Sequence, residues 1–304
     1  MKRNQLGKSG IYISELTLGC MSLAPGKQES MRIIDEALYH GINHLDTADL
    51  YDFGENEKMV GTAIKNKRED LIITSKVGNH FHKATKDWFW DPSASYIQKA
   101  VKASLQRLQT DYIDFYMLHG GTLDDPIDET IAAFESLKKE GVIRAYGISS
   151  IRPNVIREFV KKSNIDAVML QYSMLDRRAE EEIIDLLEAE QISILARGPL
   201  AKGILTEKGK EKLFDKHPEG YLTYTVDELR SIQLELEKIA VQGKSVNQLA
   251  IQYILRQPAV ASVVFGASSI NQLHENIASL APVSKKVYEQ LRHLTKQNKY
   301  TNHR

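Results

Sequence analysis

Cysteine is nearly absent from this sequence, since Cys20 is the only one in 304 residues. A single thiol cannot form an intrachain disulfide, which excludes a disulfide-stabilised secreted fold and favours a reducing compartment. Residues 1–5 (MKRNQ) also lack the apolar segment of a signal peptide. We therefore expect a cytoplasmic protein.

An excess of charge of either sign is missing as well. Lysine and arginine together number 40, aspartate and glutamate together also number 40, and the formal net charge is +0 at pH 7. A nucleic-acid-binding domain needs a basic surface, and no apolar run approaches the roughly 18 residues of a membrane helix. We expect neither nucleic acid nor a membrane as a partner. A chain of this length can bury enough surface to be stable as a monomer.

The sequence does contain an alternation of short apolar runs and amphipathic stretches. The runs are rich in β-branched and bulky residues, which is typical of buried parallel strands, and they are 16–18, 42–45, 71–75, 113–118, 143–148, 167–170, 192–196 and 262–265. Apolar residues at three-to-four spacing predict one-sided helices between them, at 30–40, 96–108, 127–139, 180–190, 226–241 and 273–280. Eight strands separated by helices fit a closed barrel better than an open sheet. The predicted fold class is α/β: a single (β/α)8 TIM barrel domain over residues 1–304.

Three segments fall outside this alternation. Residues 1–14 contain a glycine-rich turn (GKSG, 7–10) between two short arms, which predicts an N-terminal β-hairpin at the bottom of the barrel. Residues 77–95 and 203–225 are long connections after the third and seventh strands. Connections of that length are usually functional, so we expect both as loops at the face that carries the active site.

Three consecutive predicted strands end in side chains that can carry out proton chemistry. Asp46 follows the second strand, Lys76 the third and His119 the fourth. In a barrel these ends converge on the C-terminal face, where active sites form. A polar residue at one strand end is ordinary, but complementary groups at three neighbouring ends favour a catalytic site.

Tyr51 lies five residues after Asp46, at the start of a loop that can fold back over the barrel mouth. Phenols are weak acids at neutral pH, and a neighbouring ammonium such as that of Lys76, itself balanced by Asp46, stabilises the phenolate. We therefore expect Tyr51 to protonate a carbonyl oxygen while hydride arrives at the carbon, with His119 orienting that oxygen. The plainer interpretation of Tyr51 is a packed aromatic with a solvated hydroxyl.

These residues lie in motifs that resemble the aldo-keto reductase family. The motifs cover nearly the whole chain and are 41–51 (GINHLDTADLY) with 54–57 (GENE), 72–76 (IITSK), 112–119 (YIDFYMLH), 141–150 (GVIRAYGISS), 266–269 (GASS) and 272–276 (QLHEN). The resemblance implies a (β/α)8 barrel that reduces aldehydes or ketones with NADPH and without a metal. It implies the catalytic tetrad Asp46, Tyr51, Lys76 and His119, the same four residues that the strand ends and the spacing of Tyr51 indicate.

The resemblance also implies where a nicotinamide cofactor is bound. Ser149, Ser150 and Gln171 match positions at the carboxamide, and Arg197 to Gly203 match the nicotinamide and pyrophosphate region. The full set of implied cofactor contacts is Gly19, Cys20, Met21, Ser149, Ser150, Gln171, Arg197, Gly198, Pro199, Leu200, Lys202, Gly203, Gly266, Ser268, Gln272, Glu275 and Asn276. For Cys20 a buried, unreactive thiol is the preferred interpretation.

Three of these positions depart from the pattern common in the family. Ser150 stands where many relatives have asparagine, and Arg197 stands where relatives usually have an aromatic residue that stacks on the nicotinamide. An arginine plane can also stack, and it adds a positive charge beside the ring. Gln272 stands where many relatives have arginine, so NADPH is expected but NADH is possible.

The long connection 77–95 contains Trp88, Phe89 and Trp90. These aromatics either form the wall of an apolar substrate pocket or only pack the loop onto the barrel. The short pair His80 and His82 is weak support for a metal site, and no metal ligand is predicted. The dinucleotide fingerprint G-x-G-x-x-G is absent, and 243–245 (GKS) lacks the first glycine of a phosphate-binding loop.

Two other functions stay open beside carbonyl reduction. A barrel lysine such as Lys76 can form a Schiff base with a carbonyl substrate, as in lyases, although Asp46 favours its charged form. The chain can also be an NADPH-sensing subunit with little or no catalysis. The identity of the small carbonyl substrate is not encoded in any motif.

Overall fold

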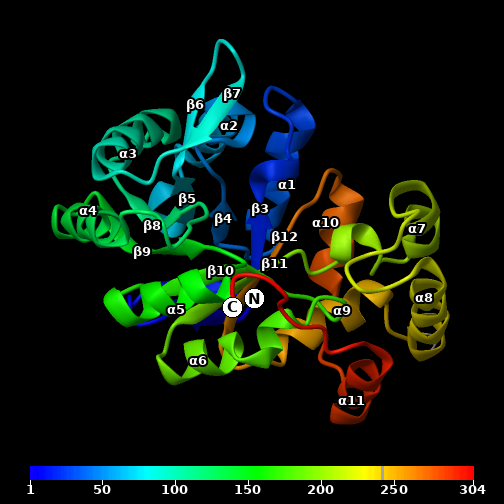
Figure 1. Ribbon diagram of the computed structural model, residues 1–304. Coiled ribbons are helices and arrows are strands. Elements are labelled where there is room, and N and C mark those ends of the chain that lie inside the picture. Colours follow the sequence, from blue (N-terminus) through cyan, green and yellow to red (C-terminus); the bar gives the residue numbers. More distant parts are fainter. Residues whose placement is uncertain (241–242) are drawn as a thin grey trace.

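Eight parallel strands close into a barrel in the computed structural model, which describes residues 1–240 and 243–304 (Figure 1). Each barrel strand pairs with the next one along the chain, and the last pairs with the first. The strands are β3 (Leu16–Gly19), β4 (His44–Asp46), β5 (Ile72–Val77), β8 (Ile113–Leu118), β9 (Ile143–Ser149), β10 (Ala167–Gln171), β11 (Ser193–Arg197) and β12 (Val260–Phe265). The predicted (β/α)8 barrel is confirmed.

Helices surround the barrel and cover its outer face (Figure 1). They are α1 (Gln28–Tyr39), α2 (Glu55–Ile64), α3 (Ala94–Leu108), α4 (Ile127–Lys139), α5 (Pro153–Lys162), α6 (Ile183–Ala189), α7 (Gly209–Lys216), α8 (Val226–Ala240), α9 (Val246–Leu255), α10 (Ile270–Ala278) and α11 (Lys285–Leu294). The six predicted helices correspond to α1, α3, α4, α6, α8 and α10. The predicted end of α8, Val241, lies outside the described residues.

Helices α2, α5, α7, α9 and α11 were not predicted, and α9 shows one physical reason. Eight of its ten residues are buried, so the helix has no polar face to produce a recognisable period. Its start is marked by Ser245, whose hydroxyl accepts a hydrogen bond from the backbone N–H of Gln248. The segment that resembles the end of a phosphate-binding loop is therefore the N-terminal cap of a helix.

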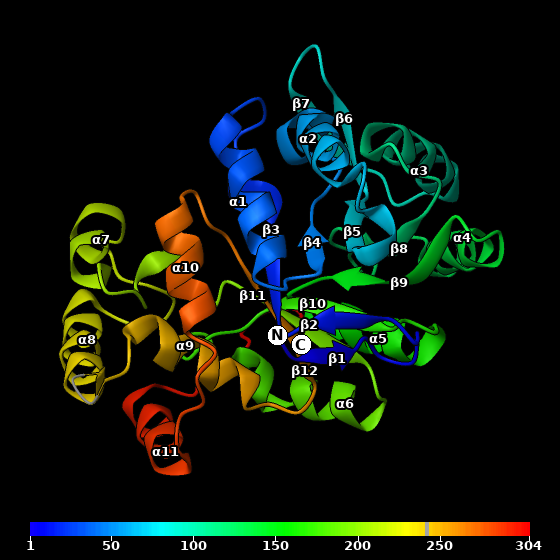
Figure 2. The same ribbon diagram turned by 180° about the vertical axis from the view of Figure 1, so that it is seen from behind.

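An N-terminal hairpin closes the end of the barrel opposite the strand C-termini, as predicted. It consists of β1 (Arg3–Gln5) and β2 (Tyr12–Ser14), and Figure 2 shows it from that side. The Asn4 side chain donates to the carbonyl of Ala261 at 2.8 Å, and the N–H of Gly7 donates to the Ser193 hydroxyl at 2.8 Å. Leu6 and Ile13 are fully buried in the apolar cluster inside the barrel.

The two long connections contain regular structure rather than extended loops. Residues 77–95 form an antiparallel hairpin of β6 (Asn79–His82) and β7 (Asp87–Trp90), and residues 203–225 contain α7. The helix of the second connection is highly charged (GKEKLFDK), which conceals its apolar side in the sequence. Within the described part of the chain, no helix is both long and apolar enough to cross a membrane.

The N-terminal hairpin of β1 and β2 should contribute to stability through its buried face alone. Ile13→Ala removes a fully buried side chain and should lower the free energy of unfolding by about 2–5 kcal/mol. The matched control Tyr12→Ala lies next to it on the opposite face, with the side chain 54% exposed, and should change stability by no more than about 0.5 kcal/mol. Urea unfolding of both variants tests this, and equal losses would contradict it.

Candidate active site

A buried ion pair joins the ends of β4 and β5. Asp46 lies beside Thr74 in the strand register, and Lys76 follows Thr74 by two residues, so both side chains point into the barrel. The Lys76 Nζ lies 2.7 Å from the Asp46 Oδ1 and donates a hydrogen bond to the Thr47 carbonyl at 2.8 Å. The Lys76 side chain is completely buried.

The surroundings of Lys76 keep its amine protonated. Burial opposes the charged form, but attraction to Asp46 and Tyr51 and the hydrogen bonds to both outweigh it, so the pKa of Lys76 is raised above its usual value. A permanently charged ammonium is thus held within the barrel at neutral pH.

Tyr51 reaches this ammonium from the loop after β4. The Lys76 Nζ donates to the Tyr51 hydroxyl at 3.3 Å and lies 4.9 Å from the centre of its ring. The next three residues, Asp52, Phe53 and Gly54, all have positive φ angles of 48°, 52° and 87°. This left-handed stretch reverses the chain directly after Tyr51 and sends it into α2.

His119, at the end of β8, is the fourth member of the group. Its ring meets that of Tyr51 edge-on, with 5.8 Å between centres. Burial, reinforced by the charges of Lys76 and Arg197, lowers the pKa of His119 to about 3, so the imidazole is neutral at physiological pH. Its buried Nδ1 has no hydrogen-bond partner among the described residues, which favours the tautomer with the proton on Nε2.

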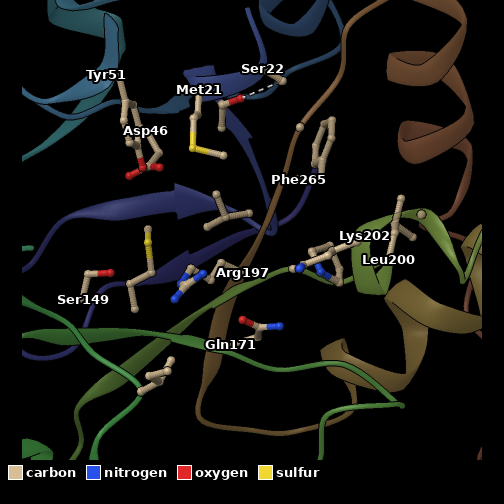
Figure 3. Close-up of a pocket in the computed structure, with 18 of the residues that line it drawn as sticks. Met21, Ser22, Asp46, Tyr51, Ser149, Gln171, Arg197, Leu200, Lys202 and Phe265 are labelled. Atoms are coloured by element: carbon tan, nitrogen blue, oxygen red, sulfur yellow. Dashed lines mark hydrogen bonds between the residues drawn. The ribbon is translucent and has the colours of Figure 1, made fainter. Parts of the chain in front are cut away.

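The group lies at one end of a cleft of about 1230 Å³ over the C-terminal face of the barrel. Figure 3 shows Asp46 and Tyr51 at one end, Lys202 and Leu200 at the other, and Arg197 and Gln171 between them. All of the residues predicted for the site line this cleft except Lys76, Cys20, Ser268 and Phe89.

Three of these exceptions have simple structural reasons. Lys76 is completely buried and contacts Asp46 and Tyr51, which line the cleft in its place. Cys20 is fully buried with its thiol directed at the Leu18 carbonyl, and burial raises the pKa of that thiol. Ser268 is tied by its N–H and hydroxyl to the Gln272 side chain, which itself lines the cleft.

Successive side chains of strand β7 point to opposite faces, so Phe89 faces away from the side that carries Trp88 and Trp90. Trp88 and Trp90 line the cleft, whereas Phe89 packs against His80 with ring centres 4.6 Å apart. The Trp90 indole N–H also donates to the Asp125 carboxylate at 2.9 Å. Trp90 therefore lines the cleft and also ties the hairpin to the loop after β8.

The structure adds three residues that no motif indicated: Tyr221, Lys208 and Lys212. Gln171 donates from its amide nitrogen to the buried Tyr221 hydroxyl at 2.8 Å, which sets the orientation of the amide facing the cleft. Lys208, directly before α7, and Lys212, within α7, also line the cleft. Their segment carries no motif, so only the folding of residues 203–225 over the barrel reveals them.

A layer of polar side chains lies inside the barrel beneath the ion pair. The His44 ring bonds to Thr17 at 2.8 Å and to Thr74 at 2.6 Å, and Thr17 bonds to Ser262 at 2.6 Å. Burial, with a smaller effect of the Lys76 charge, lowers the pKa of His44 to about 3. A neutral His44 avoids a second positive charge directly below Lys76.

A (β/α)8 barrel with an acid, a lysine, a tyrosine and a histidine at one cleft has the features of a barrel enzyme for proton-coupled chemistry. Residues 15–296 match the Aldo/keto reductase family. The chain belongs to this family and is an oxidoreductase of that class.

Individual relatives agree with this assignment. The chain is 53% identical to an uncharacterised oxidoreductase of Bacillus subtilis, YqkF, with both chains covered completely, and 32% identical to the NADH-specific methylglyoxal reductase of Escherichia coli, covering 92% of this chain and 94% of the relative. The structure is similar to the holo form of the aldo-keto reductase AKR11C1 from Bacillus halodurans, with a TM-score of 0.94, 50% identity, and 100% and 99% of the two chains covered.

His44 should make the protein less stable in acid. The folded protein keeps this imidazole neutral to a pH of about 3, whereas the unfolded chain binds a proton below about pH 6.5. The unfolded state therefore gains protons between these values, and stability falls as the pH falls, by about 2 kcal/mol between pH 7 and 5. Between pH 7 and pH 5, the free energy of unfolding of His44→Gln, measured in urea, should therefore fall by about 2 kcal/mol less than that of the wild type.

The control for this experiment is His293→Gln, which removes an exposed histidine on α11. Its stability should fall with pH as steeply as that of the wild type. Equal pH dependence of His44→Gln and the wild type would refute a neutral His44 in the folded state.

Proposed function

We propose that this chain reduces aldehydes or ketones to alcohols by hydride transfer from NADPH, with Tyr51 as the proton donor. The observation that carries the proposal is the buried Lys76–Asp46 pair in contact with the Tyr51 hydroxyl at the cleft. A charged ammonium 3.3 Å from a phenol stabilises the phenolate that remains after the proton has left. Family membership supports the same reaction class.

His119 and Tyr51 converge on the place where a carbonyl oxygen would lie. A neutral imidazole with its proton on Nε2 can donate a hydrogen bond to that oxygen without adding a charge. Tyr51 then transfers its proton to the oxygen, and Lys76 and Asp46 stabilise the tyrosinate. Asp46 balances the lysine so that the charge can be kept in a buried position.

The cleft fits an extended nicotinamide dinucleotide, which supplies the hydride from its ring when bound. Ser149, Ser150 and Gln171 offer hydrogen bonds for a carboxamide near the tetrad. The positive side chains of Arg197, Lys202, Lys208 and Lys212 follow along the cleft and suit the phosphates. The other proposed contacts are Gly19, Met21, Gly198, Pro199, Leu200, Gly203, Gly266, Gln272, Glu275 and Asn276.

The substrate is proposed to be a small carbonyl compound that binds beside Trp88 and Trp90, since both indoles line the cleft. The relatives differ in activity: one is a methylglyoxal reductase and another, from Arabidopsis thaliana, is an L-galactose dehydrogenase. Rates of NADPH and NADH oxidation over a panel of aldehydes, ketones and sugars are therefore the direct way to identify the substrate.

Schiff-base chemistry at Lys76 is disfavoured by the same geometry. A nucleophilic lysine must be neutral and accessible, whereas Lys76 is completely buried, paired with Asp46, and has a raised pKa. Among the residues that the structure describes, no specific contact favours a sensing subunit over an enzyme. Reduction remains the function with the most support.

Tyr51→Phe should abolish the reductase activity while leaving cofactor binding intact. Removing the proton donor should lower kcat by about 10²–10⁴-fold, whereas Tyr12→Phe, an exposed phenol at the other end of the barrel, should leave kcat unchanged. The measurements are steady-state NADPH oxidation and cofactor titration by fluorescence. Lys76→Met should give a similar loss, with circular dichroism to establish that it folds. Full activity of Tyr51→Phe would exclude the proposed role.

Gln272→Arg should increase the preference for NADPH over NADH. The side chain of Gln272 lines the cleft on α10 and is half of a neutral pair with Ser268. An arginine there can form charge-assisted hydrogen bonds to the 2′-phosphate, which contribute about 1.5–3 kcal/mol, so the ratio of kcat/KM values should rise at least about tenfold. Gln106→Arg, on the exposed side of α3, controls for added charge. An unchanged ratio of kcat/KM with NADPH to kcat/KM with NADH would contradict the proposed contact between Gln272 and the adenosine end of the cofactor.

A further inference from the structure

A group of metal-ligating side chains lies outside the cleft, where α1 meets α10. Both ribbon views show these two helices side by side (Figures 1 and 2). Glu36 lies in the last turns of α1, His40 follows one turn later, and His274 comes from α10. Glu36 and His274 are 238 residues apart in the sequence, so only the fold brings them together.

The two imidazoles direct the same nitrogen at the same carboxylate oxygen. The Glu36 Oε1 lies 2.8 Å from the His274 Nε2 and 3.2 Å from the His40 Nε2. The three ligand atoms all lie within 4.8 Å of one another. Around a tetrahedral zinc ion, with bonds of about 2.0–2.2 Å, ligand atoms lie roughly 3.3 Å apart. Adjustments of about an ångström, mostly by side-chain rotation, would make room for an ion.

We infer that Glu36, His40 and His274 form a binding site for a divalent transition-metal ion, with Zn²⁺ as the preferred probe. Two imidazoles and one carboxylate are a donor set that suits Zn²⁺ and similar ions and is unsuited to Mg²⁺, which prefers oxygen ligands. The side chains are 34%, 34% and 47% exposed, so solvent can enter and a water molecule can take the fourth coordination position. Each imidazole binds as the neutral ring, with its remaining proton on Nδ1.

Other possible ligands are weaker within the described residues. No second group of three His, Cys, Asp or Glu side chains with this spacing occurs there. Cys20 is fully buried, so its thiol is not available to compete. His80, of the pair visible in the sequence, bonds to Asp91, but these side chains and His82 do not bring three ligand atoms within the same spacing.

An ion in this site would link two helices that are distant in the sequence. A ligand that binds only the folded state stabilises it by an amount that grows with the ratio of the free ligand concentration to its dissociation constant. A site assembled from α1 and α10 is absent from the unfolded chain. His274 lies between Gln272 and Glu275, both of which line the cleft, so the ion would hold the helix that carries one end of the cleft.

The test is titration of the tag-free, full-length protein with ZnCl₂ in a buffer free of chelators. Isothermal titration calorimetry measures the binding, and the midpoint of thermal unfolding measures the stabilisation. We expect one saturable Zn²⁺ equivalent per chain and a rise in the unfolding midpoint, with no response to MgCl₂ at the same concentration. The double variant His40→Gln/His274→Gln should lose both responses. Neither readout depends on reductase activity.

Two further variants keep the result decisive. Glu36→Gln preserves the shape of the side chain and removes its charge, so it should weaken Zn²⁺ binding even if the double variant folds poorly. His293→Gln removes a histidine outside the group and should bind Zn²⁺ as the wild type does. The site is refuted if the wild type binds no stoichiometric Zn²⁺, or if Glu36→Gln and the double variant respond like the wild type.

Discussion

The buried ion pair of Lys76 and Asp46 is the constraint on which the rest of the site depends. Removing one partner of such a pair leaves an uncompensated charge in the interior, at a cost of about 3–5 kcal/mol. The pair is compatible only with strand ends that place the two side chains 2.7 Å apart. The register of β4 and β5 places the two side chains together. The Lys76 ammonium also donates to the Thr47 carbonyl and to the Tyr51 hydroxyl.

The chemistry of the cleft follows from how differently its titratable groups are solvated. The same burial that makes a charged lysine require Asp46 keeps His119 and His44 neutral, with pKa values of about 3. The Lys76 ammonium, paired with Asp46, therefore stands next to a phenol and close to a neutral imidazole. This is a suitable environment for delivering a proton to an oxygen that gains negative charge.

Much of this could be predicted because the barrel strands are buried on both faces. Such strands appear as continuous apolar runs, and the polar residue that ends each run lies at the functional face. Helix α9, buried nearly all round, and the charged α7 lack that clear pattern and were missed. The position of Phe89 could not be predicted either, since it depends on the pairing of β6 with β7.

The sequence by itself determined the number and order of the barrel strands and the residues that end them, because local hydrophobic patterns and motif spacing record these properties. The tertiary structure alone decided which side chains share a surface. It turned Trp88 and Trp90 into the cleft and Cys20 away from it, brought Tyr221 to Gln171, and set His274 beside Glu36. Contacts between residues 50 or 238 positions apart depend on how the barrel closes, which no local pattern in the chain specifies.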